Sequence, residues 1–167
     1  MRKIIFLLSL FFLSCSSDDK YLINEGIVNI DYLFNSPNTE WFKNNYDSYD
    51  LDTETFDYNF SNLDKFQIEI YMNTKCHDSK REVPRLIKIL NTLNFSEDNL
   101  KIVLLNSKKQ SSDGHEKGKN ITNTPTIIFL SESIEKNRIV EFPYENLEKD
   151  ILKIINNKNY KHVYYSE

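Results

Sequence analysis

The chain has 167 residues and 40% hydrophobic content, which is enough for one domain with a real core and a short targeting segment. Its formal charge is −4 and no block of Lys and Arg is interleaved with aromatic residues, which argues against nucleic acid as a partner. The whole chain contains three glycines, too few and too scattered for a glycine-rich phosphate-binding loop.

Residues 1–14 have the pattern of a secretory signal peptide. Arg2 and Lys3 form its basic start, and the apolar run 4–13 is interrupted by Ser9 alone. A run of about ten residues is too short to cross a bilayer, which requires about twenty. We therefore expect this segment to direct export and then to be removed.

The end of the signal segment carries a lipidation motif. The residues F-L-S-C at 12–15 resemble the lipobox of bacterial lipoproteins, although Leu13 stands where a small residue is usual. This resemblance implies that Cys15 is lipidated, becomes the mature N-terminus and anchors the protein to the membrane. The following S-S-D-D-K is similar to the signal that exports Bacteroidetes lipoproteins to the cell surface. The motifs imply an outer-membrane lipoprotein, periplasmic or surface-exposed; the alternatives are an incidental cysteine and a plain solvated stretch.

Four segments are predicted along the chain. Residues 1–14 form the signal peptide, and residues 15–37, with one weak apolar patch, form a tether. Residues 38–158 form a single domain, and residues 159–167 a C-terminal tail.

Two short helices are expected before the first central strand. Thr39 is in position to cap a helix that runs through Tyr46, and Asp52 or Thr53 to begin a second one. The surrounding segment 39–63 is rich in aromatic residues. We expect these rings to cover one edge of a sheet rather than to bind a partner.

The rest of the domain alternates between strand and helix patterns. Apolar residues recur at helical spacing after the first strand, at Val83, Leu86, Ile87, Leu90 and Leu93. Strands are expected at 66–72, 100–105, 126–130 and 138–142, helices at 78–94 and 144–156, and a polar loop at 106–123. This order predicts an α/β domain with a mixed central sheet and helices on both faces.

Cys76 lies where the first of these strands turns into its helix. Unpaired backbone N–H groups at a helix start favour the thiolate form of a cysteine. Lys75, His77 and Lys80 add positive charge that favours the same form, while Asp78 opposes it. Because the segment is almost wholly polar, we expect an exposed thiol rather than a buried small hydrophobe.

A cysteine in this position, a proline inside the following helix and a Thr-Pro pair before a later strand resemble the thioredoxin-like superfamily and its three-layer fold. The residues concerned are Cys76, Pro84, Thr124 and Pro125. The chain is more closely similar to Bacteroidetes thioredoxin-like proteins with the pattern W-C-x-D-S-x-x-E-V-P. Matching positions are Cys76, Asp78, Ser79, Glu82, Val83 and Pro84. The chain departs from the superfamily at Ser79, where a second cysteine is usual, at Lys75, where Trp is usual, and at Ile70, where a buried acid is usual.

The resemblance implies thiol–disulfide exchange or isomerisation by a single thiol. Cys76 would form the mixed disulfide, aided by His77 and by a hydrogen bond from Ser79. Thr124 and a cis Pro125 would hold the substrate backbone. Partners would be protein thiols or disulfides and small glutathione-like thiols, with no cofactor. The alternative is a redox-inactive protein-binding module that keeps the thioredoxin fold at the cell surface.

Hydrolase and metal chemistry find little support in the sequence. His77 and Asp78 are adjacent to Cys76, and residues adjacent in sequence rarely converge as a catalytic triad. His115 and His162 are isolated, so no zinc-ligand spacing is present and no metal site is expected. With Cys15 acylated, Cys76 has no partner for an internal disulfide.

Overall fold

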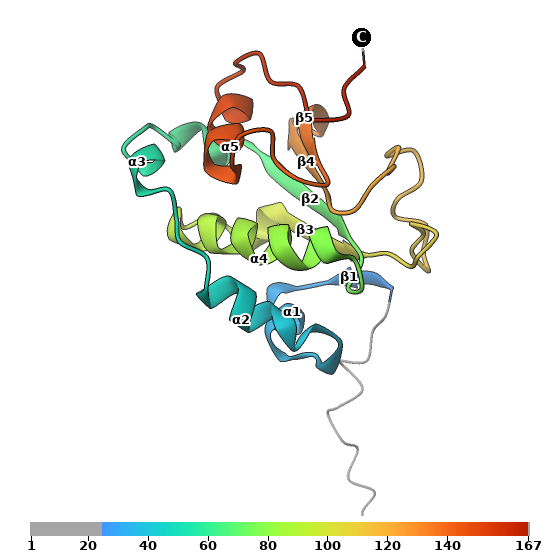
Figure 1. Cartoon of the computed structure of the whole chain (residues 1–167). Coiled ribbons are helices and arrows are strands. Elements are labelled where there is room, and N and C mark those ends of the chain that lie inside the picture. The colour runs from blue at the N-terminus through green and yellow to red at the C-terminus, as the bar shows by residue number, and fades with distance from the viewer. Residues whose placement is uncertain (1–24, 167) are drawn as a thin grey trace, which may run out of the picture.

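The computed structural model describes residues 25–166, and within them it shows a five-stranded mixed sheet in the order β1-β3-β2-β4-β5 (Figure 1). The central strand β2 pairs in parallel with β3 and antiparallel with β4, while β1 and β5 add antiparallel edges. The strands are β1 Gly26–Val28, β2 Gln67–Met72, β3 Leu100–Leu104, β4 Thr126–Ser131 and β5 Ile134–Val140. The α/β class and the mixed sheet flanked by helices are therefore confirmed, and the arrangement is compatible with a thioredoxin-like fold.

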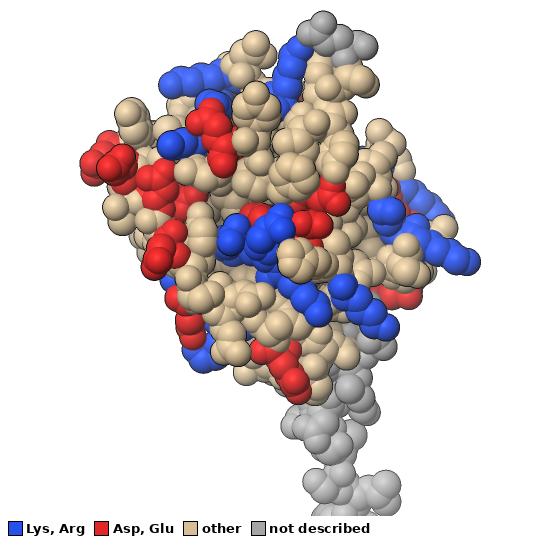
Figure 2. All heavy atoms as spheres, in the orientation of Figure 1, with Lys and Arg blue, Asp and Glu red and all other residues tan. Residues whose placement is uncertain are grey.

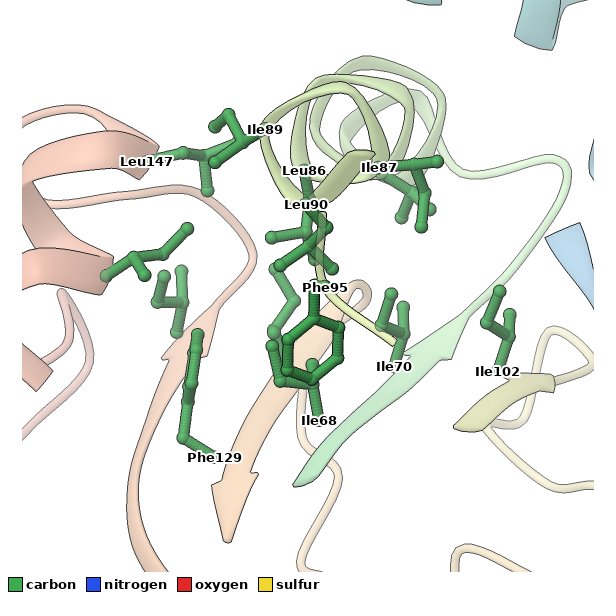
Figure 3. Packing of buried hydrophobic residues seen from close by; sticks show 14 of the residues in the cluster. Ile68, Ile70, Leu86, Ile87, Ile89, Leu90, Phe95, Ile102, Phe129 and Leu147 are labelled. Carbon is green, nitrogen blue, oxygen red and sulfur yellow. The ribbon is translucent and has the colours of Figure 1, made fainter. Parts of the chain in front are cut away.

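The helices pack on one face of this sheet. They are α1 Ile30–Asn35, α2 Trp41–Asp47, α3 Thr53–Phe56, α4 His77–Thr92 and α5 Leu147–Ile155. Figure 3 shows side chains of α4, α5 and the sheet meeting in the main core, with Leu86 and Leu90 above Ile68 and with Leu147 next to Ile89. The helical spacing of apolar residues in α4 thus corresponds to the face that it buries.

A loop forms the layer on the other face. There Tyr71, Val103 and Ile128 are buried with two leucines, and Ile121 of loop 106–123 packs against them. The loop contains turns and no helix, and Gly114 adopts a positive φ of 70° in one of them. The expectation of helices on both faces is thus corrected, because a polar segment interrupted by two glycines favours turns over helix.

Ion pairs and hydrogen bonds hold this loop to the sheet. Glu69 of β2 lies 2.7 Å from Lys119 Nζ and 3.6 Å from Lys101 Nζ, and it accepts a hydrogen bond of 2.8 Å from the Tyr71 hydroxyl. Burial opposes ionisation of Glu69, but these partners outweigh it and lower the pKa of its carboxyl. The same Tyr71 hydroxyl also donates to the His115 carbonyl oxygen, at 3.2 Å.

Most predicted elements are present with shifted ends. Helix α4 begins one residue before the predicted 78 and β5 begins at Ile134 rather than at 138. Asp52 caps α3 by accepting from the Thr55 N–H, as expected. The predicted cap at Thr39 is wrong, because its hydroxyl donates to backbone carbonyls of the preceding turn and α2 begins at Trp41.

The structure corrects the boundary of the expected tether at 15–37. Gly26 pairs with Leu104, so the chain already belongs to the sheet at β1, and α1 follows at once with Asn29 as its N-cap. The cause is the weak apolar patch itself, since Val28 and Leu33 are buried. Residues 15–24 of the expected tether and the expected signal peptide 1–14 lie outside the described residues.

The expected tail at 159–167 also begins inside the domain. Tyr160 is buried, and its hydroxyl donates to Asp150 of α5 at 3.0 Å. Its carbonyl oxygen accepts from Asn137 of β5, at 3.0 Å. Burial of this ring joins the segment after α5 to the core, which its polar composition did not indicate.

Candidate functional site

Cys76 is the N-cap residue of α4 and carries a half-buried free thiol. The turn that brings it there is organised by Asn73, which follows β2. The Asn73 carbonyl accepts from the Cys76 N–H at 3.0 Å, and its side-chain oxygen accepts from the Lys75 N–H at 2.8 Å. Its amide donates to the Leu105 carbonyl at 2.8 Å. Asn73 thus ties the turn to the end of β3, a role that the sequence analysis missed because Leu105 lies far from Asn73 in the chain.

The structure brings Cys76 together with Thr124 and Pro125. The Thr124–Pro125 peptide bond is cis, and the Thr124 carbonyl oxygen accepts a hydrogen bond from Cys76 Sγ at 3.1 Å. The Pro125 carbonyl accepts from the Glu141 N–H at 2.7 Å, which fixes this segment to the chain after β5. Three of the five residues predicted for the site in the domain therefore form one cluster.

Ser79 and His77 lie in the first turn of α4 but contact other groups. Ser79 is fully buried, and its hydroxyl oxygen accepts from the Asn73 N–H at 3.2 Å. The His77 side chain is 85% exposed and lies 3.5 Å from Arg81 and 3.9 Å from Asp78. Neither side chain is hydrogen-bonded to Cys76 among the described residues, so Ser79 supports the turn and His77 faces the solvent.

A buried acid lies further along the same helix. Glu82 is 2% exposed, and one of its carboxylate oxygens accepts hydrogen bonds from Arg81 and, at 3.3 Å, from Arg85. Its other oxygen is buried without a hydrogen-bond partner among the described residues. Arg81 also lies 2.7 Å from Asp78, so two guanidinium groups are held in place by two carboxylates.

The C-terminal segment reaches the surroundings of Thr124. The Tyr164 hydroxyl donates to Glu141, whose carboxylate also accepts from the Asn123 side chain at 3.2 Å. The ring of Tyr164 packs edge-on against Phe142, with centroids 6.3 Å apart. The hydrogen bond to Glu141, burial and the charges of Glu141 and Asp78 raise the pKa of the Tyr164 hydroxyl. This contact was missed, because nothing in the local sequence links the tail to the chain after β5.

Two further observations concern the described residues 25–166 as a whole. They contain no group of three His, Cys, Asp or Glu side chains placed to hold a metal ion. No helix in this part of the chain has the length and apolar character needed to cross a membrane.

Comparison with known proteins bears on the fold. No family model matches the chain, and no curated protein matches its sequence. Among solved structures, the chain is similar to a crystal structure of a protein of unknown function from Pseudomonas aeruginosa. The TM-score is 0.53 and the sequence identity 13%, over 86% of this chain and 99% of that one. Such a likeness supports the α/β architecture, and the site must be argued from its own residues.

Proposed function

We propose that this protein is a thioredoxin-like monothiol that exchanges disulfides through Cys76. The contact between Cys76 Sγ and the Thr124 carbonyl carries the proposal, because it places a free thiol at a helix start beside an irregular backbone segment. A thiol in the core would be unreactive, whereas the Cys76 thiol is half-buried and can reach and attack a disulfide of a partner.

The start of α4 supplies the electrostatics that the reaction needs. Helix α4 has 16 residues, and Cys76 makes no side-chain cap hydrogen bond to its first N–H groups. These groups therefore remain able to face a negative sulfur, which is the attacking species in disulfide exchange. In the structure the Cys76 thiol donates a hydrogen bond to the Thr124 carbonyl oxygen. This hydrogen bond is lost when the thiol gives up its proton to the solvent.

The exchange then follows a balanced sequence. The Cys76 thiolate attacks one sulfur of a substrate disulfide, a new sulfur–sulfur bond forms, and the substrate bond breaks to leave a substrate thiolate that takes up a proton. No second cysteine lies near Cys76 in the described residues. Release therefore needs the substrate's own thiol, which gives isomerisation, or an external small thiol.

Thr124 is placed to align the substrate chain. Its carbonyl faces Cys76, and its N–H makes no hydrogen bond to another described residue. An extended peptide beside this segment would find an unused backbone donor next to the reactive sulfur, as in strand addition to a free edge. Pro125, fixed through Glu141, would hold that donor in place.

The cellular setting is part of the proposal. The signal-like segment and the F-L-S-C motif support a lipid-anchored protein of the bacterial outer membrane, periplasmic or surface-exposed. An exported location would also expose Cys76 to protein disulfides, which are common outside the cytoplasm.

The proposal is tested with glutathione disulfide on the Cys15→Ala chain, in which Cys76 is the sole thiol. We expect the intact mass to rise by one glutathione, faster than a model thiol reacts at the same pH, and a further small thiol to remove the adduct. The added variant Cys76→Ser should show no adduct. A folded chain whose Cys76 stays unmodified would instead favour the redox-inactive binding module.

A further inference from the structure

A basic cavity lies between helices α2 and α4, one helical turn from Cys76. Its volume is about 330 Å³. One wall comes from the end of α2 and the other from the exposed side of α4, and Asn45 links the two by donating to the Lys80 carbonyl at 2.9 Å. The lining residues are Asn45, Ser48, Tyr49, His77, Lys80, Arg81 and Arg85.

The cavity carries an excess of positive charge on an acidic protein. Its lining includes Lys80, Arg81 and Arg85 but no carboxylate. Asp78 and Glu82, beside it, pair with the two arginines, whereas Lys80 has no carboxylate partner among the described residues and lies 5.8 Å from the Trp41 ring centre. Among these five charged side chains, one positive charge is left over. Figure 2 shows Lys and Arg side chains gathered over α4, with acidic side chains beside them.

Both arginines are held in position, and Arg85 keeps unused donors. Arg85 lies over the Tyr49 ring, 5.1 Å from its centre, and uses Nη1 for Glu82. Its Nη2 and Nε make no hydrogen bond within the part of the chain that the structure describes. A fixed guanidinium with free N–H groups matches a carboxylate, which it can bind through two parallel hydrogen bonds. Buried Glu82 thus holds Arg85 in place, and the other N–H groups of Arg85 stay available to bind an anion.

The position of the cavity relates it to the thiol. The Lys80 N–H donates to the Cys76 carbonyl at 3.0 Å, so Lys80 lies one helical turn, about 6 Å along the axis, from Cys76. An extended peptide advances about 3.3 Å per residue. A side chain two or three residues from a cysteine joined to Cys76 would therefore reach the cavity.

We propose that this cavity binds an Asp or Glu side chain of the disulfide substrate, two or three residues from the substrate cysteine. The inference rests on the proposed function and narrows it to disulfides in acidic peptide segments. The excess charge would also attract such segments before contact, which makes the preference sensitive to salt.

The test measures how fast two matched peptides react with Cys76 in the Cys15→Ala chain. Each peptide carries one cysteine activated as a thiopyridyl disulfide, with Glu or Gln two residues away. At low salt we expect the Glu peptide to react about fivefold faster than the Gln peptide, relative to their rates with N-acetylcysteine. The preference should fall in Lys80→Gln, which removes the unpaired charge, and return in Lys80→Arg. Lys136→Gln removes an exposed charge at the other end of the sheet and should leave the preference intact.

The outcomes separate this inference from the proposed function. Reaction of neither peptide in the folded chain would overturn the disulfide chemistry itself. Equal relative rates, or a preference that Lys80→Gln leaves unchanged, would overturn the cavity assignment alone. The reaction rate with glutathione disulfide could depend on Lys80 while the rates with its tetraethyl ester and with both peptides do not. That result would mean that the cavity binds carboxylates of small disulfides, and it would overturn the peptide assignment.

Discussion

Cys76 Sγ lies 3.1 Å from the carbonyl oxygen of Thr124, although 48 positions separate the two residues in the chain. Strand register explains this contact. Tyr71 near the end of β2 pairs with Thr126 at the start of β4, so the turn after β2 meets the segment before β4. A shift of one residue in this pairing would move every side chain of the strand to the opposite face of the sheet and would separate Cys76 from Thr124. The core that fixes the register therefore also builds the site.

Ser79→Cys should create an internal disulfide with Cys76. Ser79 is three residues after Cys76 and in the first turn of α4, a spacing that should bring the two Cα atoms within disulfide range, below about 7 Å. The loss of the Asn73 hydrogen bond to the hydroxyl should cost about 1 kcal/mol in the reduced form. On the Cys15→Ala background, peptide mapping after mild oxidation should recover the 76–79 pair.

Ser96→Cys serves as the matched control, since Ser96 is exposed beyond the far end of α4 and should give no internal pair. Dimers alone from the Ser79 variant would show that the two positions do not share a helical turn. If the pair forms, insulin reduction should appear but stay slow, since the resemblance to thioredoxins aligns buried Ile70 with the acid that dithiol members use.

Glu69→Gln should reduce stability in a pH-dependent way. The pKa of Glu69 is lowered in the folded state, so its contribution is fully present above the unfolded value of about 4.5 and is lost as pH falls through the folded pKa. At pH 7 the variant should lose about 1–2 kcal/mol, because Lys119 loses its charged partner. Urea unfolding at pH 7 and pH 3 measures this difference, which should shrink at pH 3; a difference that is constant with pH would contradict the ion-pair account.

Tyr160→Phe should show that the segment after α5 belongs to the domain. Its hydroxyl donates to the buried carboxylate of Asp150. Burial raises the pKa of this carboxyl, and the hydrogen bonds that it accepts from Tyr144, Tyr160 and Glu145 oppose that rise. Removal of one donor should cost about 1–3 kcal/mol at pH 7. The cost should be smaller near pH 3.5, where a protonated carboxyl needs that donor less.

Tyr165→Phe is the control for this prediction, because the Tyr165 side chain is half exposed. Thermal unfolding should separate the two variants, with the control within about 0.5 kcal/mol of the parent. Equal and negligible effects would mean that the segment from residue 159 is a tail after all.

Cys15→Ala should release the protein from the membrane fraction of the native host and abolish acyl labelling. Stable attachment needs acyl chains on this residue in the proposed lipoprotein. Fractionation with the parent chain beside it measures the effect, and Ser16→Ala is the matched control that should remain attached. Unchanged partition of the Cys15 variant would refute the lipid anchor.

The fold could be predicted where a pattern of apolar residues extends over several turns or along a strand. The site could be predicted where its residues lie within or next to such a pattern. Helix α4 was found because its apolar residues repeat over several turns, and the site cysteine because it directly follows a buried strand. Strand β1 was missed because three residues cannot establish an alternating pattern. The roles of Asn73 and Tyr160 depend on partners far away in the chain, and no local signal encodes such contacts.

The basic cavity escaped the sequence analysis for a related reason. From the sequence, Lys80 was used only as a charge beside Cys76, and Arg81 and Arg85 were not considered. The wall that faces these three side chains comes from the end of α2. Only the packing of α2 on α4 encloses them. The sequence shows that these charged residues are close together in the chain, but it does not show that the end of α2 lies opposite them.

The most direct test of the account is the formation of a mixed disulfide at Cys76 with the chain folded and unfolded. On the Cys15→Ala chain, the rate of adduct formation with glutathione disulfide is followed by intact mass at pH 7, in buffer and in urea. The account predicts a higher rate in the folded chain, because only there is Cys76 held beside the free N–H groups at the start of α4. A folded chain that reacts more slowly than the unfolded one would contradict it and would leave the thiol as a structural residue.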